Sequence, residues 1–335
     1  MSDPTTESTP ATSSSPPDAD ASPIGHVLVC LDRSVLAHSA LPYARYIADS
    51  FGAQLTLLHV LPSPGKGRQD ALEWEIAQRE ANHYLDDART ILGTASTTIT
   101  TRLAQGTPAR EIVAACRDID LTILSSQGEG GGPAAELGSV AHHVLAVASG
   151  SVLLLQPHST AQIPPRRLLV PLDGSLRAES VLPIVAGLAR GHDCTVVLVH
   201  VVRDPTAMAV LADPRDVELA EQLAGRVEVN AEGYLARIRA RMLSTVGNVE
   251  TIVMRRPEER QAVLDVAQQQ NIDLVVVTAH GSTCNAGCIF GSVSSYLLAQ
   301  SRLPILVLQD MPRHESSARS QVARASSSSH PPVNY

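Results

Sequence analysis

Apolar residues along the chain follow two alternating patterns. Short continuous apolar runs, such as residues 27–31, are typical of strands buried on both faces of a sheet. Longer segments between them, such as residues 34–50, carry apolar residues every three or four positions and indicate amphipathic helices. The first half therefore predicts strands over 27–31, 54–60, 97–103, 121–125 and 151–156, and helices over 34–50, 73–92, 108–117 and 139–148.

The whole pattern occurs twice. The segment HVLVCLDRS from His26 returns as RLLVPLDGS from Arg167, and LLHV returns as LVHV, both 141 residues later. LGSV returns as FGSV 153 residues later, so the second copy carries extra residues before its glycine-containing loop. Strands that alternate with helices predict right-handed crossovers and a doubly wound sheet. The predicted fold class is α/β: two tandem, Rossmann-like, doubly wound parallel five-stranded sheets of the adenine-nucleotide-binding type.

The two copies lie between low-complexity ends. Residues 1–23 contain 15 Ser, Thr or Pro residues, and residues 311–335 are Ser-rich. Neither segment has enough apolar residues to offset the entropy of ordering, so we expect both to be disordered tails that can be removed without loss of folding. The predicted domains are residues 24–157 and residues 166–310, joined by a short linker.

The composition limits the classes of partner and the compartment expected for this protein. The net charge is −8, which disfavours binding to nucleic acid or to an anionic membrane surface. Lys66 is the single lysine, so a phosphate site built on lysine is disfavoured. The first residues lack the pattern of a secretory signal, and no apolar run approaches the ~18 residues of a spanning helix. Five cysteines, an odd and sparse number, fit a reducing compartment. We expect a cytoplasmic protein with no nucleic-acid or membrane partner.

Candidate binding residues gather at one edge of each predicted sheet. Asp32 and Asp173 end their first strands, and a glycine-containing loop follows the fourth strand of each copy. In an open parallel sheet these carboxyl ends form the ligand crevice. Backbone N–H groups and a helix N-terminus can hold phosphate there, and a carboxylate can accept a hydrogen bond from the amino group of adenine. The loop residues are Gly128, Gly138 and Ser139 in the first copy, and Gly281, Gly291 and Ser292 in the second.

With these residues in place, the chain resembles the universal stress protein family, as a tandem member over about residues 24–310. ATP-binding members carry Gly, two residues, Gly, nine residues, and then Gly with Ser or Thr. Here Ser125 and Thr278 replace the first glycine of the two copies. The resemblance implies that Asp32 and Asp173 meet adenine, that Val60 and Val201 contact it through the backbone, and that the loop residues hold the phosphates of ATP. Mg²⁺ is considered separately as a companion ion of the phosphates.

Structural roles compete with this interpretation. Asp32, Asp173, Ser139 and Ser292 are also suited to capping the helices that follow them. The strand histidines His59 and His200, and the cysteines Cys30, Cys116 and Cys194, are expected to be core residues. His280, Cys284 and Cys288 have spacing that suits zinc, but no fourth ligand is evident and the first copy lacks the cluster, so we predict no metal site.

Three functions remain open. The first is a nucleotide-binding stress or regulatory protein that changes partners with its ligand and works with a regulatory protein of unknown identity. The second is a nucleotide-free interaction module. The third is a slow ATP-hydrolysing enzyme, which is disfavoured because the two loops carry no Lys or Arg.

Two further expectations concern assembly and asymmetry. The apolar last strands, residues 151–156 and 305–309, are expected to pair with each other across the two domains, because bare apolar edges promote aggregation. Self-association into a homodimer is expected to follow.

The second copy is expected to bind nucleotide better. Glu129 and Glu136 lie in the first loop, whereas no charged residue lies between Gly281 and Ser292. Arg33 complicates this expectation, because its side chain is placed either to pair with a carboxylate or to reach a phosphate.

Overall fold

The computed structural model describes residues 22–63, 71–93, 97–128, 137–157, 159, 161–204, 213–281 and 289–309. The first half contains β1 (His26–Leu31), α1 (Val35–His38), α2 (Ala40–Phe51), β2 (Gln54–Leu61), α3 (Ala71–Leu92), β3 (Ile99–Gln105), α4 (Pro108–Ala115), the 3₁₀ turn η1 (Cys116–Asp118), β4 (Leu121–Ser125), α5 (Ser139–Val147) and β5 (Ser151–Leu155). The second half contains β6 (Arg167–Pro171), α6 (Leu176–Glu179), α7 (Leu182–Ala189), β7 (Thr195–Arg203), α8 (Pro214–Met242), β8 (Asn248–Arg256), α9 (Glu259–Gln269), β9 (Leu274–Thr278), α10 (Ser292–Gln300) and β10 (Ile305–Leu308).

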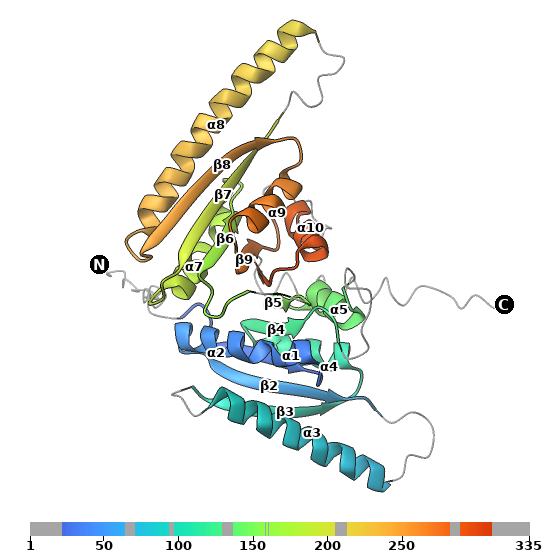
Figure 1. Cartoon of the computed structure of the whole chain (residues 1–335). Coiled ribbons are helices and arrows are strands. Elements are labelled where there is room, and N and C mark those ends of the chain that lie inside the picture. The colour runs from blue at the N-terminus through green and yellow to red at the C-terminus, as the bar shows by residue number, and fades with distance from the viewer. Residues whose placement is uncertain are drawn as a thin grey trace, which may run out of the picture.

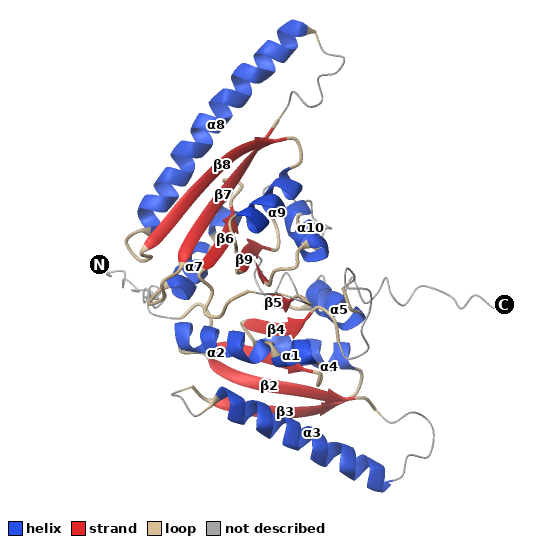
Figure 2. Cartoon of the chain, viewed as in Figure 1, coloured by secondary structure: helices blue, strands red, loops and turns tan. Residues whose placement is uncertain are grey.

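All ten of these strands form a continuous sheet in the order β3-β2-β1-β4-β5-β10-β9-β6-β7-β8. Within each half the strands are parallel and the order reverses beside the first strand, as a doubly wound fold requires. Figure 1 shows α3 and α8 at opposite ends of the molecule. In Figure 2 the strands run in succession through both halves with helices packed beside them. The α/β class predicted from the sequence is confirmed.

The two halves join through their last strands. β5 and β10 pair antiparallel, with Leu154 opposite Ile305 and Val152 opposite Val307. This is the pairing that the apolar last strands predicted. Because β5 and β10 run in opposite directions, the strands of the two halves point in opposite directions. Their carboxyl ends therefore lie on opposite sides of the sheet, at the two ends of the strands. The two predicted sites therefore open away from each other.

Both faces of the sheet are covered, which explains why the strands are apolar throughout. Val27 and Val29 of β1 belong to the core packed beneath α2, α3, α7 and α8. Leu28 and Cys30 of the same strand face the opposite core, beneath α4, α5, α9 and α10. Successive side chains point to opposite faces of a strand, so each face receives every second residue. Cys116 and Cys194 are also buried, as predicted.

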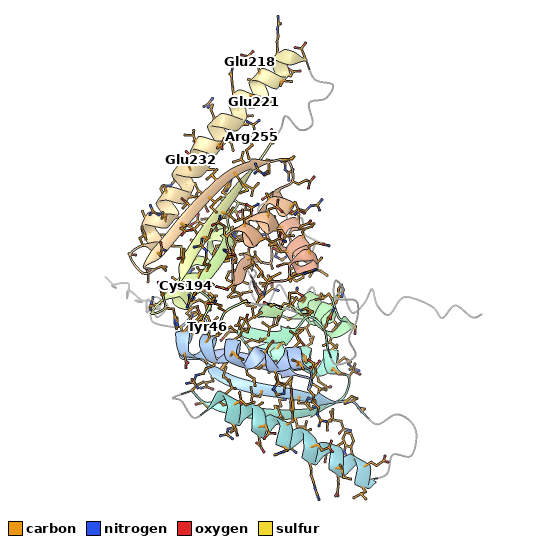
Figure 3. The ribbon with its side chains drawn as sticks, viewed as in Figure 1. Tyr46, Cys194, Glu218, Glu221, Glu232 and Arg255 are labelled. Atoms are coloured by element: carbon orange, nitrogen blue, oxygen red, sulfur yellow. The ribbon has the colours of Figure 1, made fainter. Side chains whose placement is uncertain are left out.

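Helices α2 and α7 also connect the halves. The Tyr46 hydroxyl donates a hydrogen bond to the Leu188 carbonyl oxygen, and the rings of Tyr46 and His192 lie 5.2 Å apart. On the opposite face, the buried Gln156 amide donates to the Leu298 carbonyl oxygen at 3.3 Å. Figure 3 shows Tyr46 and Cys194 near this junction. Polar contacts therefore fix the two halves on both faces of the shared sheet.

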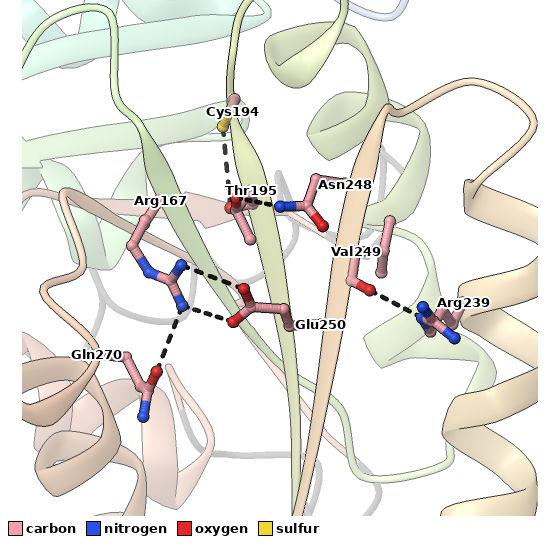
Figure 4. Close-up of polar contacts among 8 residues, drawn as sticks. All are labelled: Arg167, Cys194, Thr195, Arg239, Asn248, Val249, Glu250 and Gln270. Atoms are coloured by element: carbon pink, nitrogen blue, oxygen red, sulfur yellow. Dashed lines mark hydrogen bonds and ion pairs between the residues drawn. The ribbon is translucent and has the colours of Figure 1, made fainter.

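Ion pairs hold the outer elements of the second half. The Arg167 guanidinium donates to both carboxylate oxygens of Glu250 and to the Gln270 side chain (Figure 4). Arg255 on β8 pairs with Glu221 of α8 at 2.7 Å and with Asp204 at 2.8 Å, near the outer end of α8 (Figure 3). These contacts join α8 and the end of α9 to the sheet.

Several element boundaries differ from the prediction by one or two residues, and one predicted helix is divided. The predicted helix over 34–50 is divided at Ser39 into α1 and α2, because Ser34 caps a short first turn and Ser39 then serves as its C-cap. β3 begins at Ile99 rather than at residue 97. The predicted tails lie almost entirely outside the described residues. Among the described helices, none is long and apolar enough to cross a membrane.

Candidate functional site

The turn after each first strand presents an aspartate. Asp32 Oδ1 accepts a hydrogen bond from the Ser34 N–H at 3.0 Å, and Asp173 Oδ1 accepts one from the Ser175 N–H at 3.0 Å. The helix caps are the serines, because Ser34 Oγ accepts from the Ala37 N–H and Ser175 Oγ from the equivalent group of α6. The capping role proposed for the aspartates is therefore wrong. Each aspartate instead orders its turn and places its second oxygen toward the glycine loop.

The middle residue of this turn differs between the halves. Arg33 has φ of 69° and Gly174 has φ of 83°, a left-handed conformation that a residue with a side chain adopts at a cost. Arg33 is held there because its N–H donates to the Tyr84 hydroxyl at 3.1 Å and its guanidinium lies over the Tyr84 ring. The same guanidinium approaches Glu80 at 3.7 Å. Of the two roles considered for Arg33, the structure shows pairing with a carboxylate.

Each loop glycine lies against the aspartate of its own half. A Cβ on Gly128 would stand 2.7 Å from Asp32 Oδ2, and a Cβ on Gly281 would stand 2.6 Å from Asp173 Oδ2. Side chains do not approach that closely, so a larger residue at either position would force the carboxylate to move. The sequence-predicted aspartate and glycine are thus brought into contact in both halves.

The second glycine of each loop begins the following helix. Gly138 is the N-cap of α5 and Gly291 is the N-cap of α10, and neither helix has a side-chain cap. Ser139 and Ser292 are the first residues inside these helices, so their predicted capping role is wrong. The Gly138 N–H donates to the Ser126 carbonyl oxygen at 2.7 Å, which closes the described ends of the first loop on each other. The remaining N–H groups of the first turn of α5 provide the positive end of a helix dipole.

In the first half these groups surround a cavity of about 520 Å³, which we call the first-half cavity. Its apolar walls come from β1, β2, β4, α4 and α5. All six predicted first-half residues line it: Asp32, Val60, Ser125, Gly128, Gly138 and Ser139. Asp32 is the one charged residue among the described residues of the lining. The structure therefore combines an apolar slot, one carboxylate and a helix N-terminus.

Ser126 is a lining residue that the sequence interpretation did not single out. It is 2% exposed, and its hydroxyl has no hydrogen-bond partner in the described structure. A buried hydroxyl without a partner costs about 1–3 kcal/mol, so a ligand that supplied a partner would recover that cost. The equivalent residue of the second half is Ala279. The sequence feature that could have indicated Ser126 as a site residue is its position, as a polar residue directly after an apolar strand.

The equivalent second-half cavity is much smaller, at about 80 Å³. It is lined by all six predicted second-half residues: Asp173, Val201, Thr278, Gly281, Gly291 and Ser292. The Thr278 hydroxyl donates to the His280 carbonyl oxygen at 2.7 Å, and the Ser294 hydroxyl donates to the Thr278 carbonyl oxygen at 2.7 Å. These hydroxyls are therefore engaged with the backbone.

A second carboxylate also lines the second-half cavity. It belongs to Glu259, the first residue of α9. Burial raises the pKa of Glu259 above its usual value; Arg203 opposes this shift, and Asp173 adds to it. The sequence favoured the second copy as the better anion site because no charged residue lies between Gly281 and Ser292. The larger first-half cavity and the carboxylate of Glu259 in the second-half cavity instead favour the first copy.

The remaining candidates have structural positions or lie outside the description. His59 Nδ1 donates to the Leu31 carbonyl oxygen and His200 Nδ1 to the Leu172 carbonyl oxygen, both at 2.7 Å, which fits the predicted core role. Cys284, Cys288, Glu129 and Glu136 lie outside the described residues. Among the residues that are described, no group of three or more His, Cys, Asp or Glu side chains is arranged to hold a metal ion.

Known proteins are similar to this chain in sequence and in fold. The sequence profile of the universal stress protein family matches residues 23–156 and 165–309. A universal stress protein of Mycolicibacterium smegmatis is 25% identical over 296 residues, which covers 84% of this chain and 96% of that protein. Crystal structures of a putative universal stress protein from Pseudomonas aeruginosa and of a universal stress protein from Archaeoglobus fulgidus share the fold. Their TM-scores are 0.62 and 0.60 at 17% and 19% identity, with 90% and 85% of this chain and 98% of each of those chains covered.

Proposed function

The chain belongs to the universal stress protein family, and we propose that it is an adenine-nucleotide-binding regulatory protein whose ligand site is the first-half cavity. The observation that carries the proposal is the cavity of about 520 Å³. Small-molecule sites usually have volumes of about 300–1,000 Å³, mostly apolar walls and a few well-placed polar groups. The first-half cavity meets each of these conditions, whereas the second-half cavity is below that range.

Adenine is the part of the ligand that the apolar slot fits. Leu58, Val60, Ile112 and Leu124 line the cavity and offer aliphatic surface to a flat ring. Asp32 lines the same cavity. A carboxylate accepts a hydrogen bond from the exocyclic amine of adenine, whereas guanine presents a carbonyl oxygen at the same position, which a carboxylate repels. The proposal therefore includes a preference for adenine over guanine nucleotides.

The phosphates are assigned to the part of the cavity formed by the glycine loop and the N-terminus of α5. Gly128 lines this part beside Asp32, and Gly138 and Ser139 line it at the start of the helix. Backbone N–H groups and a helix dipole bind phosphate without a lysine, which suits a chain with a single lysine. A Mg²⁺ ion, when present, would be held mainly by the phosphates and water, as is usual for this ion.

A regulatory role is proposed rather than metabolic catalysis. Among the described residues that line the first-half cavity, no Lys, Arg or His side chain is present to stabilise a transferred phosphoryl group or to act as a general base. Nucleotide binding is instead expected to change the surface around the cavity and so the choice of protein partner. A nucleotide-free interaction module and a slow ATPase remain the alternatives that the experiment must separate.

Mass spectrometry of small molecules released from freshly purified protein tests the proposal. We expect an adenine nucleotide, in an amount that falls sharply in a Gly128→Glu variant and is retained in the matched Gly281→Glu variant. Phosphate release on incubation with ATP separates a binder from an ATPase. Protein that contains no nucleotide and takes up none when ATP is added would support the interaction module instead.

A further inference from the structure

The two cavities are lined by equivalent residues, yet one has about 520 Å³ and the other about 80 Å³. Three substitutions reduce side-chain size in the second half: Leu58 is replaced by Val199, Ile112 by Val263 and Leu124 by Val277. Two others add atoms, because Cys30 is replaced by Pro171 and Ala141 by Ser294. These opposing changes do not account for the smaller second-half cavity. The difference in volume therefore needs another cause.

The two cavities also differ at the first residue of the helix that forms one wall. Pro108 opens α4 and lines the first-half cavity, and Glu259 opens α9 and lines the second-half cavity. Four residues later, Ile112 and Val263 line the same two cavities, which confirms that Pro108 and Glu259 occupy equivalent positions. A compact ring in one half is thus replaced by a long carboxylate in the other.

Glu259 is held in place by a partner that the first half lacks. Arg203 Nη2 lies 3.8 Å from Glu259 Oε2, and the Glu259 side chain is 31% exposed. Arg203 ends β7, and the residue at the equivalent place after β2 is Pro62. Pro108 and Pro62 in the first half therefore correspond by position to the ion pair of Glu259 and Arg203 in the second half. Both members of the pair are specific to the second copy.

We infer that Glu259, held by Arg203, closes the second-half cavity to nucleotides and makes the first half the nucleotide-binding half of the chain. The side chain lines the cavity at the position that Pro108 occupies in the first half, and its carboxylate interacts with that of Asp173. Asp173 already lines this cavity, so an entering polyphosphate meets two carboxylates there rather than one. Like charges a few ångströms apart repel each other, and more strongly where water is partly excluded. This inference rests on the proposed function of the first-half cavity.

The test removes the first-half site so that binding reports on the second half alone. Isothermal titration with ATP is carried out on full-length Gly128→Glu protein, with and without Glu259→Ala. We expect no binding in the parent and measurable ATP binding after Glu259→Ala. Glu259→Pro is a second variant, since proline is well tolerated at the first position of a helix. Binding in the parent, or its absence in both Glu259 variants when they are folded by circular dichroism, would overturn the inference.

The reciprocal exchange tests the same residue in the first half. Pro108→Glu in the otherwise unchanged protein should weaken ATP binding by at least about tenfold, because it introduces the second carboxylate. An unchanged affinity would also overturn the inference. If the unchanged protein binds no ATP while the Gly128→Glu, Glu259→Ala protein does, the proposed function of the first-half cavity fails and the role of Glu259 stands. If the unchanged protein binds ATP and the Glu259 variants do not, the reverse holds.

Discussion

Asp32 and Gly128 are in contact just beyond the carboxyl ends of β1 and β4, so close that a Cβ on Gly128 would lie 2.7 Å from Asp32 Oδ2. The two residues are far apart in sequence, and they meet because β1 and β4 are neighbours in the sheet. The glycine therefore has a specific role: it lets the backbone of the loop approach the carboxylate that faces the cavity.

The contact predicts that Gly128→Ala displaces the Asp32 carboxylate. The methyl group has no room beside Oδ2, so the acid must rotate away from the position proposed for the adenine amine. We expect ATP affinity to fall by at least about tenfold, measured by calorimetry. Gly281→Ala is the matched control, because it makes the same clash with Asp173 in the second half. A Gly128→Ala protein that binds ATP as tightly as the unchanged protein would contradict the role of this contact.

The turn after β6 predicts a change in stability that does not depend on ligand. Gly174 has φ of 83° and nothing within 4 Å of the place where a Cβ would stand, so Gly174→Ala adds backbone strain without a clash. We expect a loss of about 1–2 kcal/mol in the free energy of unfolding. Gly225→Ala, at an open position inside α8, should instead gain up to about 1 kcal/mol. Urea denaturation measures both, and equal effects of the two variants would refute the assignment.

The junction between the halves predicts a cost for losing one hydroxyl. Tyr46→Phe removes the hydrogen bond to the Leu188 carbonyl oxygen in a buried position. We expect a loss of about 1–3 kcal/mol in the free energy of unfolding. Tyr296→Phe, which removes an exposed hydrogen bond to Gln261, is the control and should cost less than about 0.5 kcal/mol. A Tyr46→Phe loss as small as that of the control would show that this contact does not hold the halves together.

Glu259 predicts a pH dependence of stability. Burial raises the pKa of Glu259, so the ionised carboxylate is less favourable in the folded than in the unfolded protein. The resulting penalty is present above the folded-state pKa and disappears as the pH falls below the unfolded value of about 4.3. We expect Glu259→Gln to be more stable than the unchanged protein at pH 7.5, with the difference lost at about pH 4.

Urea denaturation at the two pH values measures this difference. Glu258→Gln is the control, because Glu258 is the exposed neighbour of Glu259 and its side chain is 67% exposed. Its substitution should change stability by less than about 0.5 kcal/mol at either pH. A Glu259→Gln protein that is less stable at pH 7.5 would mean that the ion pair with Arg203 outweighs the cost of burial.

Much of the architecture was predictable because it follows from patterns along the chain. The repeated apolar runs predicted the parallel sheets, and the apolar last strands predicted the pairing of β5 with β10. The meeting of Asp32 with the glycine loop was predictable as well, since the carboxyl ends of parallel strands lie at the same edge of a sheet.

The inequality of the two cavities was not predictable in the same way. Glu259 reaches its cavity from a helix that precedes the glycine loop, so counting charges within the loop missed it. The offset between the copies also changes from 141 to 153 between the second strand and the loop, which hides the equivalence of Pro108 and Glu259. The unpaired Ser126 hydroxyl likewise becomes evident only from its burial and its lack of a partner in the described structure.

The central claim, that the first-half cavity binds an adenine nucleotide through Asp32, is tested most directly by parallel calorimetric titrations with ATP and GTP. The proteins compared are the unchanged chain, Asp32→Ala and Asp173→Ala, which lose equivalent turn hydrogen bonds to Ser34 and Ser175. We expect the unchanged chain and Asp173→Ala to bind ATP more tightly than GTP. In Asp32→Ala we expect ATP affinity to fall by at least about tenfold and the preference for ATP over GTP to be lost. ATP binding that survives in Asp32→Ala but disappears in Asp173→Ala would contradict it.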